Sequence, residues 1–378
     1  MYFQLVLIIC LLLFFIYHKN GNRQPVIYFL IVWASITIIY IFSPEYYPLS
    51  IETNLYLSFF IVTFCITYMV FQNIFKYKIL LPERVYISKN LIYFLCIVVS
   101  LFTIIKGILI LNTLGFNLML FRTQLMAGNI TGLGIGISLP ISFLGLYLSR
   151  RSNNVIMFII FFCFSLVISL ISTSKIFLLL VVMYSMGINN KIEIKKIFFI
   201  SIGILSVFIL SSILLNKFSS SINDGFFNAI YDTFRVYFIS GVSAFNLYIN
   251  DNAFIPNNIL LYPFKDLLSD AYDIPLSDIL PWINTGTWDT NVYTGFLPWY
   301  QAIGFISCFI LGGGLGIYYA FWFNPNLGYI AKFYQIFLYF PLLILFFQEH
   351  FLLSWKMHLS YILCMLLLVF VKNRELHE

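Results

Sequence analysis

Long apolar stretches recur from one end of the chain to the other, separated by short polar connections. A bilayer core about 30 Å thick needs roughly 20 apolar residues in a helix, and a helix satisfies every backbone polar group within lipid. The pattern therefore predicts an all-α polytopic membrane protein of about eleven transmembrane helices. The predicted helices are 2–17, 26–43, 55–75, 91–111, 131–149, 155–172, 176–188, 197–215, 297–323, 333–354 and 357–371.

One connection is far longer than the others and divides the chain into three parts. Residues 1–215 hold the first eight predicted helices, residues 216–296 form a large outer loop, and residues 297–378 hold the last three helices and a short tail. We expect one integral domain, because no part has the composition of a soluble domain. Long loops are usually functional or disordered, and the aromatic content of this one argues against disorder.

Within the outer loop, residues 226–249 have the spacing of an amphipathic helix. Its apolar positions, three or four residues apart, are Phe227, Ile230, Phe234, Tyr237 or Phe238, Gly241 and Phe245. Its polar positions are Asn228, Asp232, Arg235 and Asn246. The segment is too short and too polar to span a bilayer, so we expect it to lie at the membrane interface or to pack on the helix bundle.

The composition favours lipid as the surrounding solvent, because 61% of the residues are hydrophobic and only 10% are charged. Lysine and arginine divide unevenly between the two sets of connections, fourteen in one set and six in the other, with Lys106 inside a helix. The positive-inside rule makes the richer set cytoplasmic. Eleven crossings then give a periplasmic N-terminus and a cytoplasmic C-terminus in a bacterial inner membrane.

Several classes of function are disfavoured. The net charge of +6 is scattered between apolar segments, so no nucleic-acid partner is expected. The chain has no GxxxxGK[ST] and no GxGxxG, and its cytoplasmic connections are short, which argues against an ATP-driven pump. Asp266, Asp270 and Asp273 share one helical face, which favours a solvated surface over a metal site. We expect no metal and no cofactor.

Three cations stand near the predicted outer surface: Arg122, Lys175 in a SerThrSerLys turn, and Arg235 on the amphipathic helix. Arginine binds phosphate oxygens in bidentate fashion, so these cations are candidates for clamping a pyrophosphate. The alternatives are snorkelling of Arg122 and Lys175 to the interface and an ion pair of Arg235 with Asp232.

Glu349 and His350 are adjacent in an apolar run near the outer end of the tenth predicted helix. A charge at the bilayer centre costs about 2.5–3.5 kcal/mol, so this pair indicates a polar cavity and a candidate general base. The alternative is a hydrogen-bonded pair that ties helices together.

Aromatic residues gather before the ninth predicted helix, where Trp282, Trp288 and Tyr293 stand beside Asp, Asn and Thr. Aromatic faces next to polar side chains suit sugar rings, which present C–H faces and hydroxyl edges. An aromatic belt at the membrane interface is the alternative.

The segment TNVYTGFLPWYQAIGFI (290–306) resembles the N-x-Y-T…Y-x-x-x-G signature of the Wzy-type O-antigen polymerases, which polymerise oligosaccharide repeat units. The turn 172–175 and the segment 237–245 also resemble patterns of that family. The layout is similar as well, with ten to fourteen spans, a large late outer loop and an arginine in each of two outer loops.

The resemblance implies a glycosyltransferase of the GT-C kind that acts at the periplasmic face in lipopolysaccharide or capsule biosynthesis. It would join undecaprenyl-pyrophosphate-linked repeat units, with other such units as acceptors, and work with a chain-length co-polymerase. Arg122, Arg235 and Lys175 would neutralise the leaving pyrophosphate, and Glu349 or His350 would act as the base. Asn291, Tyr293 and Thr294 would orient sugars.

Three further functions stay open. The related O-antigen ligases carry a histidine in their long outer loop, and loop 216–296 has none, which favours a polymerase. A flippase for lipid-linked oligosaccharides is expected to show internal repeats, and none is evident. A membrane O-acyltransferase usually places His and Arg on the cytoplasmic side of its early helices, where this chain offers only His18.

Overall fold

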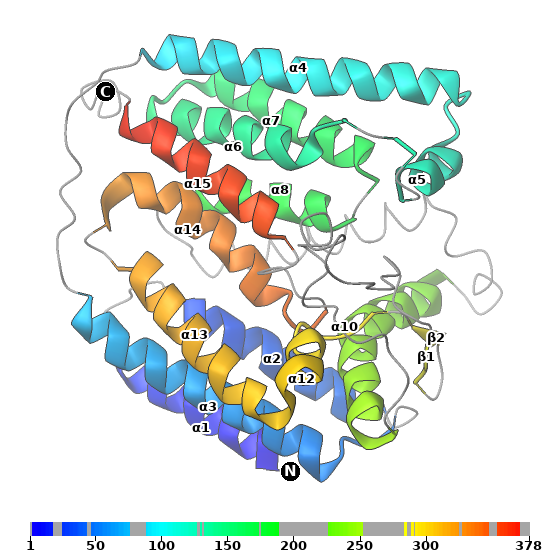
Figure 1. Ribbon diagram of the computed structural model, residues 1–378, viewed down its shortest axis with the longest axis vertical. Coiled ribbons are helices and arrows are strands. Elements are labelled where there is room, and N and C mark those ends of the chain that lie inside the picture. Colours follow the sequence, from blue (N-terminus) through cyan, green and yellow to red (C-terminus); the bar gives the residue numbers. More distant parts are fainter. Residues whose placement is uncertain are drawn as a thin grey trace, which may run out of the picture. The chain divides into compact units, whose positions relative to one another are not determined.

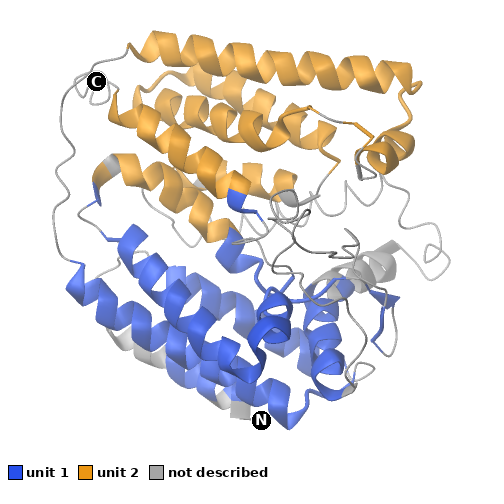
Figure 2. Ribbon diagram, viewed as in Figure 1, with its two compact units in different colours: residues 1–79, 230–327, 341–355 blue, residues 80–229, 328–340, 356–378 orange. Residues whose placement is uncertain are grey.

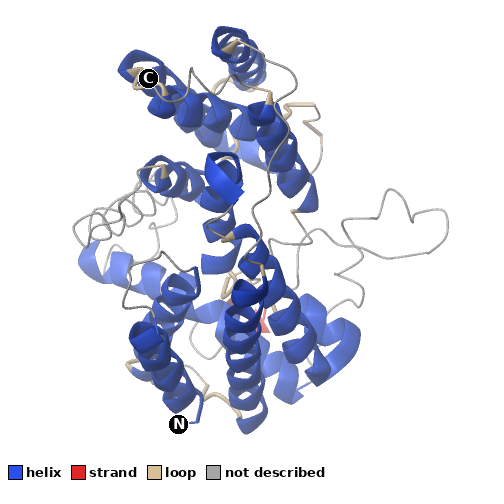
Figure 3. Ribbon diagram, turned by 90° about the vertical axis from the view of Figure 1, so that its left-hand side faces the viewer, coloured by secondary structure: helices blue, strands red, loops and turns tan. Residues whose placement is uncertain are grey.

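The computed structural model describes residues 2–17, 25–43, 47–75, 88–126, 129–130, 132–173, 175–188, 226–251, 283–285, 289–290, 292–324, 327–347 and 354–370. Nearly all of these residues are in helices or short connections (Figure 3). One antiparallel strand pair, β1 (Ile283–Asn284) with β2 (Asp289–Thr290), lies within the predicted outer loop. The chain divides into two compact units, and each draws on several parts of the sequence (Figure 2).

Unit 1 consists of residues 1–79, 230–327 and 341–355. Its helices are α1 (Tyr2–Tyr17), α2 (Pro25–Ile41), α3 (Ile51–Ile74), most of α10 (Phe226–Asp251), α12 (Leu297–Ile303) and α13 (Ser307–Trp322). Helices α3 and α13 lie side by side (Figure 1). A Cβ at Gly312 would lie 2.9 Å from the Phe60 carbonyl oxygen, and one at Gly316 would lie 2.7 Å from the Cβ of Thr67. Glycines four residues apart therefore let the two backbones approach closely, as in other membrane helix pairs.

Unit 2 consists of residues 80–229, 328–340 and 356–378. It contains α4 (Lys89–Thr113), α5 (Leu118–Met126), α6 (Ile135–Arg151), α7 (Val155–Ile171), α8 (Lys175–Gly187), most of α14 (Gly328–Leu343) and nearly all of α15 (Trp355–Val369). Small residues again allow close packing, since a Cβ at Gly145 of α6 would lie 2.5 Å from the ring of Phe161 on α7. The hydroxyls of Ser142 and Ser165 join the same two helices through a 2.8 Å hydrogen bond.

The helices have the lengths and composition of a membrane protein. Ile51–Ile74, Lys89–Thr113 and Leu297–Trp322 are each long and apolar enough to cross a bilayer, and four of the described helices are shorter but also apolar. The prediction of an all-helical membrane protein is therefore confirmed. Most predicted boundaries agree with the structure within a few residues.

Two predicted helices differ from the observed ones. The predicted helix 297–323 is broken at Gly304 into α12, a 3₁₀ turn and α13, because Gly304 adopts φ +63° and ψ −148°. The predicted helix 333–354 begins earlier, and α14 ends at Leu343, followed by turns. The eighth predicted helix, 197–215, lies outside the described residues.

The predicted outer loop 112–130 contains a helix, α5, that the apolar pattern does not predict. Asn117 caps it, since its side-chain oxygen accepts a hydrogen bond from the Leu120 N–H at 3.0 Å. Helix α6 begins at Ile135, later than predicted, because Gly132 and Gly134 have φ of +70° and +65° and turn the chain before it.

Candidate functional site

The second half of α10 packs on the helices of unit 1. Ile239, Val242 and Phe245 are buried. The ring of Phe245 lies 5.2 Å from that of Tyr56 on α3 and 5.7 Å from that of Tyr300 on α12, measured between centroids. Of the two expected positions for this amphipathic helix, packing on the bundle is confirmed for its described side chains.

The assignment of Asn246 to the polar face of that helix is wrong. Asn246 is buried, and its side-chain oxygen accepts a hydrogen bond from the Ser50 N–H at 2.8 Å. Its amide group donates to the Pro48 carbonyl oxygen at 3.1 Å. These two bonds satisfy a buried polar side chain and attach α10 to the start of α3.

The turn 292–296, which carries part of the signature, is held between α10 and the residues that follow α14. A Cβ at Gly241 would lie 2.6 Å from the Phe346 carbonyl oxygen and 3.5 Å from the Thr294 nitrogen, so only glycine permits this approach. The Gly295 N–H donates a hydrogen bond to the Leu345 carbonyl oxygen at 2.7 Å. The segments 237–245 and 290–306 therefore meet in space beside residues 344–347.

Tyr300, the second tyrosine of the signature, connects α12 to the start of α3. Its hydroxyl donates a hydrogen bond to the Glu52 carboxylate at 2.7 Å, and its ring lies 6.2 Å from that of Tyr248 on α10. Glu52 is exposed in the first turn of α3, where the helix dipole stabilises a negative charge. The sequence pattern does not indicate this pair, which sits next to the signature turn.

Polar atoms near the signature lack partners. Among the described residues, the Thr294 hydroxyl, the Trp299 indole N–H and both polar atoms of the Gln301 amide are buried without a hydrogen bond. Proteins leave few buried polar groups unpaired, so such a group is a place where a polar ligand gains hydrogen bonds. Burial raises the pKa of Tyr293 to about 12, so its hydroxyl stays protonated at neutral pH.

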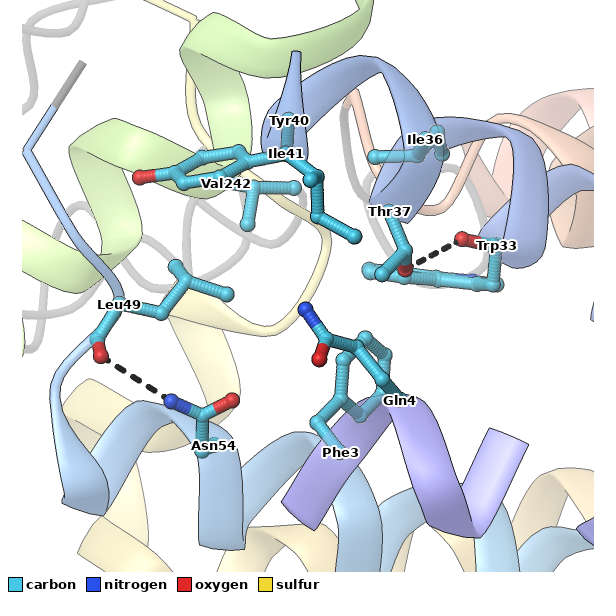
Figure 4. Close-up of a pocket in the computed structure, with 10 residues that line it drawn as sticks. All are labelled: Phe3, Gln4, Trp33, Ile36, Thr37, Tyr40, Ile41, Leu49, Asn54 and Val242. Atoms are coloured by element: carbon cyan, nitrogen blue, oxygen red, sulfur yellow. Dashed lines mark hydrogen bonds between the residues drawn. The ribbon is translucent and has the colours of Figure 1, made fainter. Parts of the chain in front are cut away.

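A small hollow also lies in unit 1, between α1, α2, α3 and α10. Its lining includes Gln4, Thr37, Tyr40 and Asn54, and the Gln4 amide points toward its interior (Figure 4). Its volume of about 30 Å³ admits one or two water molecules, each of which needs about 10–15 Å³. A sugar ring is larger, so this hollow is not a sugar site.

In unit 2, Arg122 lies on α5. The adjacent Phe121 is buried in an apolar cluster with Leu111, Leu133 and Ile171, which fixes α5 against α4, α7 and the turn before α6. Arg122 itself is half-buried, and within the described chain its guanidinium has neither a hydrogen-bond nor an ion-pair partner. A cation in this state is available to an anionic ligand.

Lys106 on α4 reaches the glycine-rich turn that precedes α6. Its ammonium donates a hydrogen bond to the Gly132 carbonyl oxygen at 2.8 Å. The ammonium group of Lys106 is therefore bound to a specific backbone carbonyl of the turn.

A comparison with known proteins decides the family. The chain is 43% identical over 344 residues to an O-antigen polymerase of Shigella dysenteriae, and the match covers 91% of this chain and 90% of that protein. The chain belongs to the O-antigen polymerase family. No family model and no solved structure matches it.

The family resemblance noted from short motifs is thus confirmed for the O-antigen polymerases. In unit 2, the segment 172–175 joins α7, which ends at Ile171, to α8, which begins at Lys175, and the described residues 172 and 173 form a turn. Thr173 in this turn has a φ of +53°. In unit 1 the other two motifs meet at Gly241 and Thr294, as described above.

The structure describes some of the predicted site residues. Arg122 and Lys175 belong to unit 2 and Arg235 to unit 1, while the side chains of Lys175 and Arg235 lie outside what the structure describes. Tyr293 and Thr294 are buried in the signature turn. The predicted residues that lie outside the described ranges are Trp282, Trp288, Asn291, Glu349 and His350, together with Asp266, Asp270 and Asp273.

The pyrophosphate clamp, the sugar-orienting residues and the general base therefore stay predictions. Helix α14 ends at Leu343, and the expected position of Glu349 and His350 near the end of that helix lies outside the described residues. Among the described residues, no cluster of three His, Cys, Asp or Glu side chains offers a metal site.

Proposed function

We propose that this protein polymerises undecaprenyl-pyrophosphate-linked oligosaccharide repeat units into O-antigen or capsular polysaccharide at the periplasmic face of the inner membrane. Membership of the O-antigen polymerase family over nearly the whole chain carries this proposal. The meeting of two family motifs at the signature turn supports it, because the Thr294 hydroxyl is buried there without a partner among the described residues and could bind a sugar hydroxyl.

In the proposed reaction, a hydroxyl oxygen of one lipid-linked repeat unit attacks the anomeric carbon of another. A bond forms between that oxygen and carbon, and the bond from the carbon to the donor pyrophosphate breaks. Undecaprenyl pyrophosphate leaves with the bonding electron pair, and the hydroxyl proton passes to a base on the protein. Glu349 and His350 are our candidates for the base, since a neutral histidine or a carboxylate accepts a proton near neutral pH.

Charge neutralisation is the main catalytic requirement, because pyrophosphate leaves as an anion. We assign this role to Arg122, Lys175 and Arg235, with arginine able to bind two phosphate oxygens at once. Arg122 is half-buried and has no partner among the described residues, which supports its part in this assignment. The contacts of the Lys175 and Arg235 side chains with the pyrophosphate are part of the proposal.

Sugars would be oriented by the signature segment. Tyr293 offers a protonated hydroxyl, and the Thr294 hydroxyl lacks a partner among the described residues. Asn291 would add an amide that both donates and accepts, and Trp282 and Trp288 would stack on sugar faces.

The proposed framework has eleven crossings of GT-C type, a periplasmic N-terminus and a cytoplasmic C-terminus. The outer ends of α3, α12 and α14 would then face the periplasm together with α10, where lipid-linked donors are found. A chain-length co-polymerase is the expected protein partner.

The test is complementation of a strain whose own copy of the gene is deleted, with surface glycan separated on a gel. The proposal predicts single repeat units on lipid A in the deletion strain and a restored ladder when the protein is supplied. No surface repeat at all would favour a flippase, and a complete ladder with altered acetylation would favour an O-acyltransferase. Either result would overturn the polymerase assignment.

A further inference from the structure

Lys106 is a cation inside an otherwise apolar helix. It lies about two turns before the end of α4 at Thr113. Ionisable residues within membrane helices are costly and are retained mainly for function or for pairing with an opposite charge. Lys106 is half-buried, so a partner for its ammonium group is expected.

The visible partner of Lys106 is a neutral carbonyl. The hydrogen bond to Gly132 uses one of the three donors of the ammonium group. Gly132, at φ +70°, is exposed, and a Cβ there would lie 3.0 Å from the Lys106 nitrogen. A glycine at this position thus leaves space beside the ammonium on the surface of the turn.

Lys106 has no acidic residue near it in the sequence. The sequence contains no Asp or Glu between Glu83 and Glu193, although eight lysines and arginines fall in that interval. The described part of unit 2 as a whole also contains no acidic residue. Within the described chain, neither Lys106 nor Arg122 forms an ion pair. Among the described residues, both cations therefore lack a carboxylate partner.

One apolar cluster packs together the segments that carry Arg122 and Gly132. Phe121, next to Arg122 on α5, and Leu133, next to Gly132, are both buried in it against Leu111 of α4. The helix that carries Arg122 and the turn that binds Lys106 are thus packed on the same end of α4.

We propose that Lys106, together with the Gly132 turn and Arg122, binds the pyrophosphate group of the lipid-linked donor. This inference rests on the proposed function and adds a lysine that the family motifs do not indicate. The two remaining donors of Lys106 would bind phosphate oxygens as a point charge, while Arg122 would bind in bidentate fashion. The polyprenyl chain would extend along the lipid-facing surface of α4, where Phe102, Ile105 and Leu109 are exposed.

The experiment measures binding of farnesyl pyrophosphate to the full-length purified protein in detergent by titration calorimetry. Lys106→Met removes the charge while keeping a similar length, and we expect affinity to fall by about tenfold or more. Lys106→Arg should retain most of the affinity. The matched control is Lys89→Met, which removes a cation from the opposite end of the same helix and should bind as the wild type does.

Other probes separate the possible sources of phosphate. Inorganic pyrophosphate should bind more weakly than farnesyl pyrophosphate but with the same dependence on Lys106. Vesicles of phosphatidylglycerol should compete poorly. Equal, Lys106-dependent binding of phosphatidylglycerol and farnesyl pyrophosphate would overturn the assignment to a lipid pyrophosphate.

The inference also fails if Lys106→Met binds farnesyl pyrophosphate with wild-type affinity, whatever happens to thermal stability. That result would limit Lys106 to its hydrogen bond with the Gly132 carbonyl. If the wild type makes polymer and Lys106→Met still binds farnesyl pyrophosphate with wild-type affinity, only the present inference falls. If the wild type makes no polymer, the proposed function itself falls.

Discussion

At the scale of single residues, a buried hydroxyl without a hydrogen bond lowers the stability of the folded protein but can serve function by binding a ligand. Thr294 lies in the signature turn and Ser100 lies in α4, and in the described chain neither hydroxyl has a hydrogen bond. An unpaired buried hydroxyl is a cost to the folded state, because it has lost its hydrogen bonds to water. At Thr294, a bound sugar hydroxyl would supply the missing hydrogen bond.

Thr294→Val should therefore raise or leave unchanged the thermal stability, with a gain of up to about 1 kcal/mol, and lower polymer formation about tenfold. Thermal unfolding in detergent and the length of the glycan ladder measure the two effects. The control Ser100→Ala should match it in stability without loss of polymer. Full activity of Thr294→Val would remove Thr294 from the sugar site.

Tyr293 has a defined protonation state in the range where the enzyme works. Its pKa, raised to about 12 by burial, lies above its ordinary value near 10, so the phenol remains protonated from pH 6 to pH 9. The fractional loss of polymerisation rate in Tyr293→Phe should then be the same throughout this range. A wild-type rate that rises about tenfold per pH unit, with the rise absent from Tyr293→Phe, would instead identify a phenolate base.

At the scale of elements, the close contact of α3 with α13 depends on the absence of side chains at two positions. A Cβ at Gly316 would lie 2.7 Å from Thr67 and 3.0 Å from the carbonyl oxygen of Phe64, whereas nothing lies within 4 Å of a Cβ at Gly314. Packing of small residues replaces the hydrophobic effect, which is weak between helices in lipid.

Gly316→Val should consequently separate the two helices and lower the free energy of unfolding by about 1–3 kcal/mol. Gly314→Ala, on the same helix, should have no comparable effect. Unfolding in graded mixtures of mild and denaturing detergent gives both values. Equal stability of the two variants would show that α3 and α13 are not in close contact.

The elements that could be predicted are those with long apolar runs bounded by polar residues, such as α3 and α4. The break at Gly304 could not, because the apolar pattern continues through it and its left-handed φ is a property of the folded backbone. Helix α5 is short and has a weak pattern. The burial of Asn246 could not be predicted either, because its side chain forms hydrogen bonds with the backbone of Pro48 and Ser50, which are distant in sequence.

At the scale of the whole molecule, the family could be anticipated from short signatures, but the meeting of two of its motifs and the contacts of the site could not. The bond from Tyr300 to Glu52 joins residues that no local spacing relates. The sequence does show that Lys106 lies in a stretch without acidic residues, between Glu83 and Glu193. The sequence does not show that the Lys106 ammonium binds the Gly132 carbonyl oxygen.

Reconstitution of the purified protein into liposomes with a lipid-linked repeat unit as sole substrate tests the polymerase assignment most directly. We expect glycans of two or more repeat units on lipid, with one polyprenyl pyrophosphate released for each linkage formed, and a strong reduction of both in Arg122→Ala. Persistence of single repeat units with no release of polyprenyl pyrophosphate, under conditions where the protein is folded, would contradict it.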